Sequence, residues 1–189
     1  YFPQFFPYKN QLTYSKIERF DDPDKVEHPV VREALKYLGM DKIQITYDAD
    51  LPARSGLGTS SSFTVGLLNG LHSLRGEFID KMTLAREAIH VERELCHEDG
   101  GIQDQLAAAV GGLNLMEFNG DEITVDPVVV KTERKKELNS HLMLVFTGFV
   151  RFSSETLAEQ ISKTDVNVPE LKAMCKMVDQ GEHILVSNG

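Results

Sequence analysis

Residues 51–62 read Leu51-Pro52-Ala53-Arg54-Ser55-Gly56-Leu57-Gly58-Thr59-Ser60-Ser61-Ser62, so that two glycines precede four consecutive hydroxyl side chains. Glycine lets the backbone approach an anion closely and adopt positive φ angles. A helix N-terminus adds unpaired N–H groups and the positive end of the helix dipole. The stretch therefore has the composition of a phosphate-binding loop. A turn followed by an ordinary helix cap is the alternative that the same residues allow.

The flanking residues predict a strand before the loop and a helix after it. Residues 42–49 alternate polar and apolar side chains and contain β-branched residues, which is typical of a strand. Residues 63–74 are apolar on nearly all sides, which predicts a largely buried helix, capped by Thr59 or Ser60. The loop lacks the lysine of a Walker A motif and the third glycine of a Rossmann fingerprint, so neither motif applies.

This loop resembles the second signature motif of the GHMP kinase superfamily, which includes galactokinase, homoserine kinase, mevalonate kinase and phosphomevalonate kinase. The motif reads P-x-x-x-G-L-G-[ST]-S-[AS]-[AS], and the matching residues are Pro52, Gly56, Leu57, Gly58, Thr59, Ser60, Ser61 and Ser62. The resemblance implies that the loop, with Arg54 and Ser55 in it, wraps the phosphates of ATP. It also implies that the hydroxyl of Ser60 is a Mg²⁺ ligand.

A carboxylate on the next predicted helix is a second candidate metal ligand. Residues 80–96 have helical periodicity with Asp80 as the N-cap, and Glu92 shares a face with small apolar residues. Since an unpaired buried charge is costly, Glu92 should face a cation or strong hydrogen-bond donors. An ion pair with Arg86 or Arg93, or a face that ends before Glu92, also fits the pattern. In mevalonate-kinase-like members of the superfamily, which the Glu92-Arg93 pair resembles, a glutamate on this helix is the carboxylate ligand of Mg²⁺.

A second carboxylate, Asp104, lies in a glycine-rich segment. Glycine pairs begin and end residues 100–112 around a short alanine-rich helix, and Asp104 falls in its first turn. A simple capping role fits this position as well. The segment is similar to the one that carries the catalytic aspartate in the galactokinase and heptose kinase branches. The resemblance implies that Asp104 orients or deprotonates the attacking hydroxyl and that Gly101 and Gln103 lie near the substrate.

A third segment, residues 147–154, extends the resemblance toward sugar kinases that act on heptose 7-phosphate. Arg151 lies there beside hydroxyl side chains at a predicted helix start, where it would bind a substrate phosphate. A solvated arginine at a domain junction fits the same position. The resemblance therefore implies a phosphorylated acceptor without fixing which one.

Composition and charge fit a soluble enzyme. The chain has 189 residues, of which 41% are hydrophobic and 26% charged, and its net charge is −9. This acidic balance argues against a nucleic acid or an anionic membrane as partner, and no apolar run is long enough to span a bilayer. Cys96 and Cys175 have no paired spacing, which is typical of a reducing compartment, so we expect a cytoplasmic protein. The expected partners are a nucleotide and a small sugar, and a homodimer is left open.

The sequence predicts an α/β (α+β) protein with the GHMP kinase fold. Residues 1–138 would form the N-terminal, ATP-binding domain, which resembles the second domain of ribosomal protein S5, without its first strand. Residues 139–189 would begin a ferredoxin-like C-terminal domain. Further predicted elements are strands at residues 12–19 and 142–148 and helices at residues 30–38, 154–162 and 169–180. The family's first and third motifs are absent, so the chain resembles the middle of a longer protein.

Together these features predict Mg·ATP-dependent phosphorylation of a sugar or sugar-phosphate hydroxyl, with the anomeric hydroxyl of a heptose 7-phosphate-like acceptor expected. Phosphoryl transfer needs a phosphate site, a metal held by oxygen ligands and a base near the acceptor. The loop, the pair of Ser60 and Glu92, and Asp104 would supply them. The alternatives are a galactokinase-, fucokinase- or mevalonate kinase-like enzyme, or a catalytically silent ATP- and sugar-binding module. We expect little or no activity from these 189 residues alone.

Overall fold

The chain divides into two units, Tyr1–Val110 and Gly111–Gly189. The computed structural model describes residues 8–50, 56–120, 122–145 and 161–187. Both units contain helices and strands, as expected for an α+β protein. The domain boundary predicted between residues 138 and 139 falls inside helix α5 (Thr132–Ser140) and stays a prediction.

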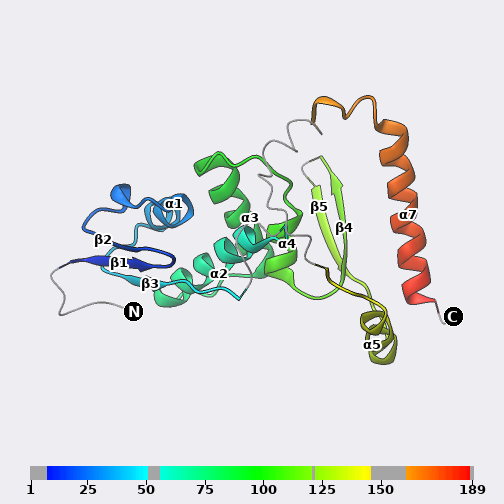
Figure 1. Cartoon of the computed structure of the whole chain (residues 1–189), viewed down its shortest axis with the longest axis horizontal. Coiled ribbons are helices and arrows are strands. Elements are labelled where there is room, and N and C mark those ends of the chain that lie inside the picture. Colours follow the sequence, from blue (N-terminus) through cyan, green and yellow to red (C-terminus); the bar gives the residue numbers. More distant parts are fainter. Residues whose placement is uncertain (1–7, 51–55, 121, 146–160, 188–189) are drawn as a thin grey trace. The chain divides into compact units, whose positions relative to one another are not determined.

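A three-stranded sheet opens the first unit (Figure 1). Its central strand, β1 (Asn10–Thr13), pairs antiparallel with β2 (Ile17–Phe20) and parallel with β3 (Gln44–Thr46). Leu12 of β1 is fully buried. Because alternate side chains of a strand point to opposite faces, Leu12 marks the face of the sheet that meets the core.

Helix α1 (Pro29–Leu38) lies between β2 and β3 in the chain and follows a short 3-10 turn, η1 (Pro23–Lys25). Proline at the first helical position and a left-handed Gly39 at the end are the usual signals of helix termini. The helix predicted at residues 30–38 is therefore confirmed. Its buried side chains join the core that contains Leu12, and they are Val30, Val31, Ala34 and Leu35.

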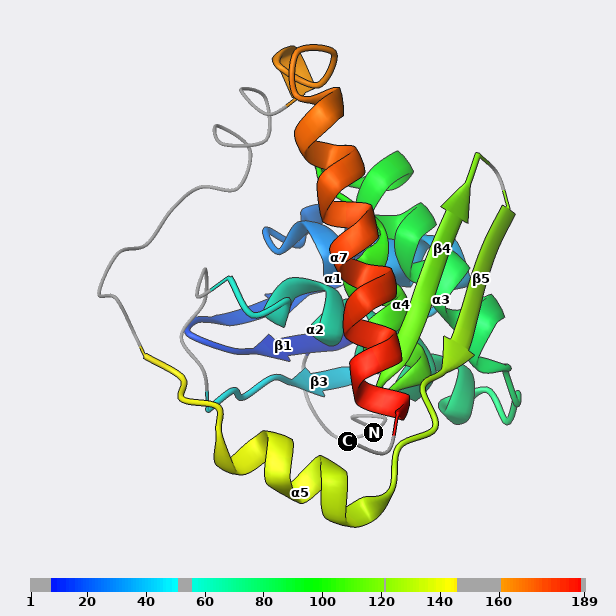
Figure 2. The ribbon, with the colours of Figure 1, turned by 90° about the vertical axis from the view of Figure 1, so that its right-hand side faces the viewer.

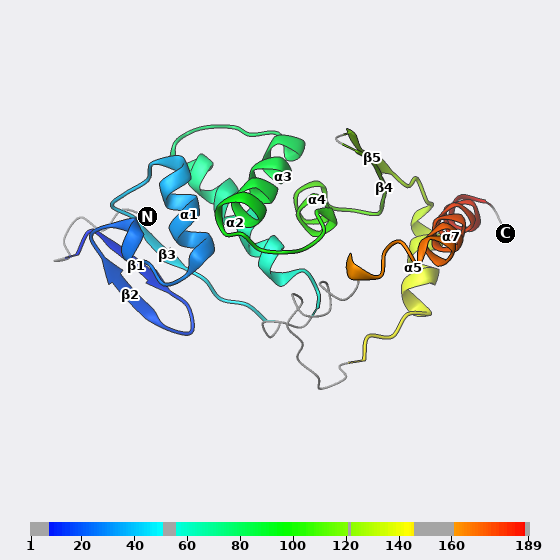
Figure 3. The same cartoon turned by 90° about the horizontal axis from the view of Figure 1, so that it is seen from above.

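The rest of the first unit is helical. It contains α2 (Thr59–Leu74), α3 (Lys81–Ile89), the π-helical turn η2 (His90–Leu95) and α4 (Gln103–Val110). Helices α2, α3 and α4 pack against one another, and α1 packs against α2 and η2 (Figure 3). The side chains buried between these elements include Leu68, Leu71, Ala88, Val91 and Leu106.

The second unit contains a two-stranded hairpin and two described helices. Strands β4 (Asn114–Asn119) and β5 (Glu122–Pro127) pair antiparallel along their whole length (Figure 2). Helix α5 (Thr132–Ser140) follows, and α7 (Val168–Val186) confirms the helix predicted at residues 169–180 and extends it. None of the helices in the described part of the chain is long and apolar enough to cross a membrane.

Three predicted strands differ from the structure. The strand predicted at residues 12–19 is split by a turn, in which the N–H of Tyr14 donates to the carbonyl of Lys16. The strand predicted at residues 42–49 is limited to β3, because β1, its partner, ends at Thr13. Residues 142–145 are irregular and exposed, since no described strand pairs with them. Residues 146–148 and most of the helix predicted at residues 154–162 lie outside the described residues.

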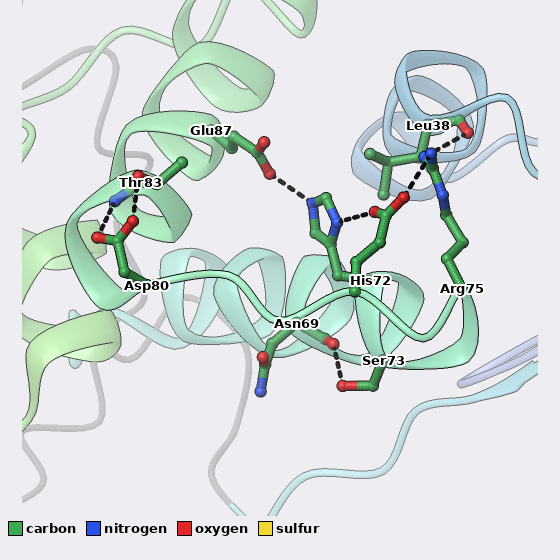
Figure 4. A network of polar contacts seen from close by, with 9 residues as sticks. Leu38, Asn69, His72, Ser73, Arg75, Asp80, Thr83 and Glu87 are labelled. Carbon is green, nitrogen blue, oxygen red and sulfur yellow. Dashed lines mark hydrogen bonds and ion pairs between the residues drawn. The ribbon is translucent and has the colours of Figure 1, made fainter.

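A buried histidine joins the end of α2 to α3 (Figure 4). Nδ1 of His72 lies 2.8 Å from a Glu77 oxygen, and its Nε2 lies 2.7 Å from a Glu87 oxygen. Only the protonated imidazolium can donate to both carboxylates. Burial lowers the pKa of His72, but the hydrogen bonds and negative charges of Glu77 and Glu87 outweigh burial, so that the pKa is raised. Arg75 completes the group through a 2.8 Å ion pair with Glu77.

We expect His72→Gln to destabilise the protein more at pH 6 than at pH 9. A raised pKa means that the imidazolium contributes its full stability below the unfolded-state value of about 6.5 and loses it as the pH rises through the folded-state pKa. The loss at pH 6 should be about 1.5–3 kcal/mol, the usual range for a hydrogen bond to a charged group. Urea unfolding followed by circular dichroism measures it. His141→Gln, at an exposed histidine, is the control, and an equal loss at both pH values in His72→Gln would contradict the charged pairing.

Candidate active site

Helix α2 begins without a side-chain cap. Its N-cap is Gly58, in the left-handed conformation with φ 65° and ψ 25°. The prediction that Thr59 or Ser60 caps the helix was wrong, because a glycine with positive φ starts the helix directly before them. Since none of the described side chains caps the first turn, its backbone N–H groups can bind an anion.

The carboxylate of Asp104 lies against this helix start. A Cβ built on Gly58 would be 3.4 Å from Cγ and 3.5 Å from Oδ2 of Asp104. Asp104 lies in the first turn of α4, as predicted, and it is exposed. The Asp104 carboxylate therefore lies beside the N-terminus of α2, at van der Waals distance from the position that a Cβ of residue 58 would take.

Glu92 is buried between α2 and α4, with only 3% of its surface exposed. The hydroxyl of Ser61 donates to its Oε2 at 2.9 Å, and the hydroxyl of Thr64 donates to its Oε1 at 2.5 Å. The side-chain amide of Gln105 donates to Oε2 as well. Glu92 was expected to face a cation or strong hydrogen-bond donors. The donors are confirmed, and they come from two helices.

No positively charged side chain in the described part of the chain forms an ion pair with Glu92, so neither Arg86 nor Arg93 neutralises it there. Hydrogen bonds from neutral donors supply no positive charge, so a buried carboxylate with only such partners is a favourable place for a cation. Mg²⁺ needs only one or two protein carboxylates, because waters and substrate phosphates complete its octahedron. No group of three or more His, Cys, Asp or Glu side chains that could hold a metal occurs among the described residues. A single carboxylate such as Glu92 is nevertheless compatible with Mg²⁺.

Glu92 is carried by the π-helical turn η2, where a continuous α-helix was predicted. Asp80 caps the preceding helix as predicted, since its Oδ1 accepts from the N–H groups of Met82 and Thr83 at 3.0 Å each. The turn then widens, and the N–H of Cys96 donates to the carbonyl of Val91, five residues back. Such π-helical insertions in α-helices are frequent at functional sites.

A groove of about 760 Å³ runs along another side of α2, next to β3. Its walls are mainly apolar and include Ile45, Tyr47, Phe63 and Leu67, while Thr59 and Ser62 line it near the start of the helix. Helix α2 thus contributes to two different environments. One face lines the groove, and the other carries Ser61 and Thr64, which contact Glu92.

The family model of the GHMP kinases N-terminal domain matches residues 26–112, a range that contains the uncapped helix start, Glu92 and Asp104. Residues 26–112 are a GHMP kinase N-terminal domain. This assignment confirms the fold class that the loop motif predicted.

Several curated and solved relatives of this GHMP kinase domain are sugar kinases. A D-glycero-alpha-D-manno-heptose 7-phosphate kinase from Campylobacter jejuni is 36% identical over 104 residues, which cover 54% of this chain and 31% of that protein. A bifunctional fucokinase/GDP-fucose pyrophosphorylase from Arabidopsis thaliana is 26% identical over 146 residues, 74% of this chain and 14% of the other. The crystal structure of a D-glycero-D-manno-heptose 1-phosphate kinase from Bacteroides thetaiotaomicron has a TM-score of 0.62 and 29% identity, over 69% of this chain and 47% of that one. The chain therefore spans less than half of the length of each of these relatives.

The GHMP kinase domain brings some predicted site residues together and not others. The hydroxyls at Glu92 are those of Ser61 and Thr64, whereas the side chain of Ser60, predicted as its metal partner, is exposed. The role of Ser60 as a Mg²⁺ ligand stays a prediction. The Gln103 amide folds over Gly101 so closely that a Cβ there would collide with it.

The remaining predicted site residues are in or beyond the loop. Gly56 has a left-handed φ of 75°, and Leu57 is 46% exposed. Predictions for the other residues stay untested, because they lie outside the described residues: Pro52, Arg54, Ser55 and Arg151.

Sequence reasoning missed Thr64 and Gln105 in the GHMP kinase domain and gave Ser61 only a phosphate role. A signal for the first was present, because Ser61 and Thr64 are three residues apart on one face of a helix that is otherwise apolar there. Buried polar side chains need hydrogen-bond partners. Gln105 had no such signal, since the partner of its amide lies on a different helix.

We expect Gly58→Ala to reduce both stability and activity of the full-length protein. The left-handed conformation costs about 1–2 kcal/mol for a residue with a Cβ, and the new methyl group would lie in van der Waals contact with the Asp104 carboxylate, in the space beside the helix start. The matched control is Gly76→Ala, which has a φ of 74° and no atom within 4 Å of the added Cβ. Both variants should lose stability in urea unfolding, but only Gly58→Ala should also lose turnover. Equal turnover in the two variants would contradict a role in activity for the position of Asp104 beside Gly58.

Proposed function

We propose that this protein transfers the γ-phosphoryl group of ATP to a hydroxyl of a sugar or sugar phosphate. The observation that carries the proposal is the Asp104 carboxylate beside the uncapped start of α2, in a domain that also buries the unneutralised Glu92. Phosphoryl transfer depends on positioning and on charge stabilisation, and these groups supply both.

The start of α2 would bind the ATP phosphates. Its first-turn N–H groups and helix dipole attract negative charge, and the left-handed backbone at Gly56 and Gly58 lets the chain curve around the phosphates. Gly58 provides no side-chain cap, so that the first-turn N–H groups can donate to water or to a bound anion. A nucleotide polyphosphate is such an anion.

Asp104 would be the base for the acceptor. The acceptor O–H bond breaks as its oxygen attacks the γ-phosphorus, and the proton moves to a carboxylate oxygen of Asp104 while ADP leaves. The exposure of Asp104 allows an acceptor to reach it from solvent. Its contact with Gly58 supports a base placed next to the transferred group.

Glu92, with Ser60, would hold Mg²⁺. When bound, Mg²⁺ neutralises charge on the phosphate oxygens during transfer. Glu92 fits this role because it is a fixed oxygen ligand, and Ser60 fits because its exposed hydroxyl lies in the first turn of α2. Two protein ligands are a common number for Mg²⁺ in such sites.

For the acceptor we propose a heptose 7-phosphate-like sugar, phosphorylated at its anomeric hydroxyl. The support comes from the relatives, which include a heptose 7-phosphate kinase and a heptose 1-phosphate kinase. Fucose is the second candidate, because the curated relatives also include a fucokinase. We further propose that the protein acts in the cytoplasm, where ATP is available.

The test is an acceptor panel with the full-length protein and Mg·ATP, in which ADP release and ³¹P NMR of the product are measured. The panel contains heptose 7-phosphate, heptose, fucose, galactose and mevalonate. We expect ADP release with a heptose phosphate and a new anomeric phosphate signal. Binding of ATP and sugar without ADP release for any acceptor would contradict phosphoryl transfer and identify a silent binding module.

We expect Asp104→Asn to lower kcat of the full-length protein at least about 100-fold, as the loss of a general base usually does. The Kd for Mg·ATP, measured by calorimetry, should stay close to the wild-type value, because phosphate binding does not use the proton acceptor. Asp126→Asn, an identical change at an exposed aspartate of β5, controls for loss of charge. Turnover near the wild-type rate in Asp104→Asn would dismiss its role as base.

A further inference from the structure

Three neutral donors converge on the buried carboxylate of Glu92. Oε2 accepts from Ser61 and Gln105, and Oε1 accepts from Thr64. A carboxylate has about four lone-pair positions, two on each oxygen. Counting the described residues, Oε2 is therefore fully used and Oε1 keeps one open position.

The orientation of Gln105 shows how strongly the carboxylate attracts donors. Its side chain is 3% exposed, and its Oε1 has no hydrogen-bond partner among the described residues. The reverse orientation would give that oxygen no better partner, because it would face the negative charge of Glu92. The amide thus leaves one buried acceptor unsatisfied in order to donate to Glu92, although such an acceptor costs about 1–3 kcal/mol.

The same donors connect the two helices of the candidate active site. Ser61 and Thr64 lie in the first two turns of α2, and Gln105 directly follows Asp104 in α4. Movement of either helix would break a hydrogen bond to Glu92. The position of this carboxylate is therefore tied to the helix start on one side and to Asp104 on the other.

We propose that Ser61, Thr64 and Gln105 are positioning residues that hold the Glu92 carboxylate in the orientation in which it binds a divalent cation. The inference rests on the proposed function, because that function assigns the cation to Glu92. Partners of metal ligands that fix ligand orientation usually change metal affinity about 10- to 100-fold when removed.

The decisive comparison is Thr64→Val against Thr64→Ser in the full-length protein. Valine matches threonine in shape but removes the hydroxyl, whereas serine keeps the hydroxyl and removes a methyl group. The measured quantity is the Kd of Mn²⁺, followed by electron paramagnetic resonance in the presence of a non-hydrolysable ATP analogue. We expect a 10- to 100-fold weaker Kd in Thr64→Val and a Kd near the wild-type value in Thr64→Ser.

Gln105→Met tests the second helix, and it should weaken Mn²⁺ binding over the same range. Thr124→Val is the control, since the Thr124 hydroxyl lies 3.4 Å from the exposed carboxylate Glu117. This change should leave the Mn²⁺ affinity unaltered. Circular dichroism of the metal-free variants verifies that each is folded at the assay temperature, and Ser61→Ala replaces any variant that is not.

The outcomes separate this inference from the proposed function. Wild-type Mn²⁺ affinity in both Thr64→Val and Gln105→Met would overturn it, even if the protein phosphorylates an acceptor. An equal loss in Thr64→Val and Thr64→Ser would also overturn it, because packing and not the hydroxyl would then be responsible. If the wild-type protein binds Mn²⁺ and nucleotide but phosphorylates nothing, the proposed function fails while the Mn²⁺ affinities still test the positioning role.

Discussion

The burial of one carboxylate, that of Glu92, is the constraint on which the arrangement of the helical part depends. A charge removed from water must be met by donors or by a cation. In this domain the donors come from Ser61 and Thr64 on α2 and from Gln105 on α4. Neither helix can shift without leaving part of the charge unpaired. One group therefore connects the uncapped start of α2 with the helix that carries Asp104.

The start of α2 is a second constraint, because no side chain of the described residues caps its first N–H groups. Most helices begin with a polar side chain that accepts from the first N–H groups. Here Gly58 occupies that position, and the room beside it is taken by the Asp104 carboxylate. A cap would stabilise the isolated domain but would compete with a bound anion. The sequence thus forgoes a stabilising interaction at the place where a phosphate would bind.

Local signals explain what the sequence could predict. The extent of α2, the Asp80 cap and the place of Asp104 in the first turn of α4 all depend on residues within a few positions of one another. The split of residues 12–19 into β1 and β2 was missed because a strand-like composition continues through the turn. The partners of Glu92 were missed for a different reason. They lie 13, 28 and 31 residues away in sequence, and periodicity places a side chain on a face without identifying what faces it.

The run of hydroxyls after Gly58 can be understood from helix geometry. Successive residues of an α-helix point about 100° apart, so neighbouring hydroxyls cannot serve the same partner. Ser61 is buried and donates to Glu92, whereas Ser60 and Ser62 on either side are exposed. A single hydroxyl could face the carboxylate or the solvent, but not both. A run of consecutive hydroxyl residues places hydroxyls on both sides of one helical turn. This explains why the sequence has four hydroxyl residues here, although a helix cap would need only one. Within the motif, Ser61 therefore contacts the carboxylate, whereas the side chains of Ser60 and Ser62 are open to solvent.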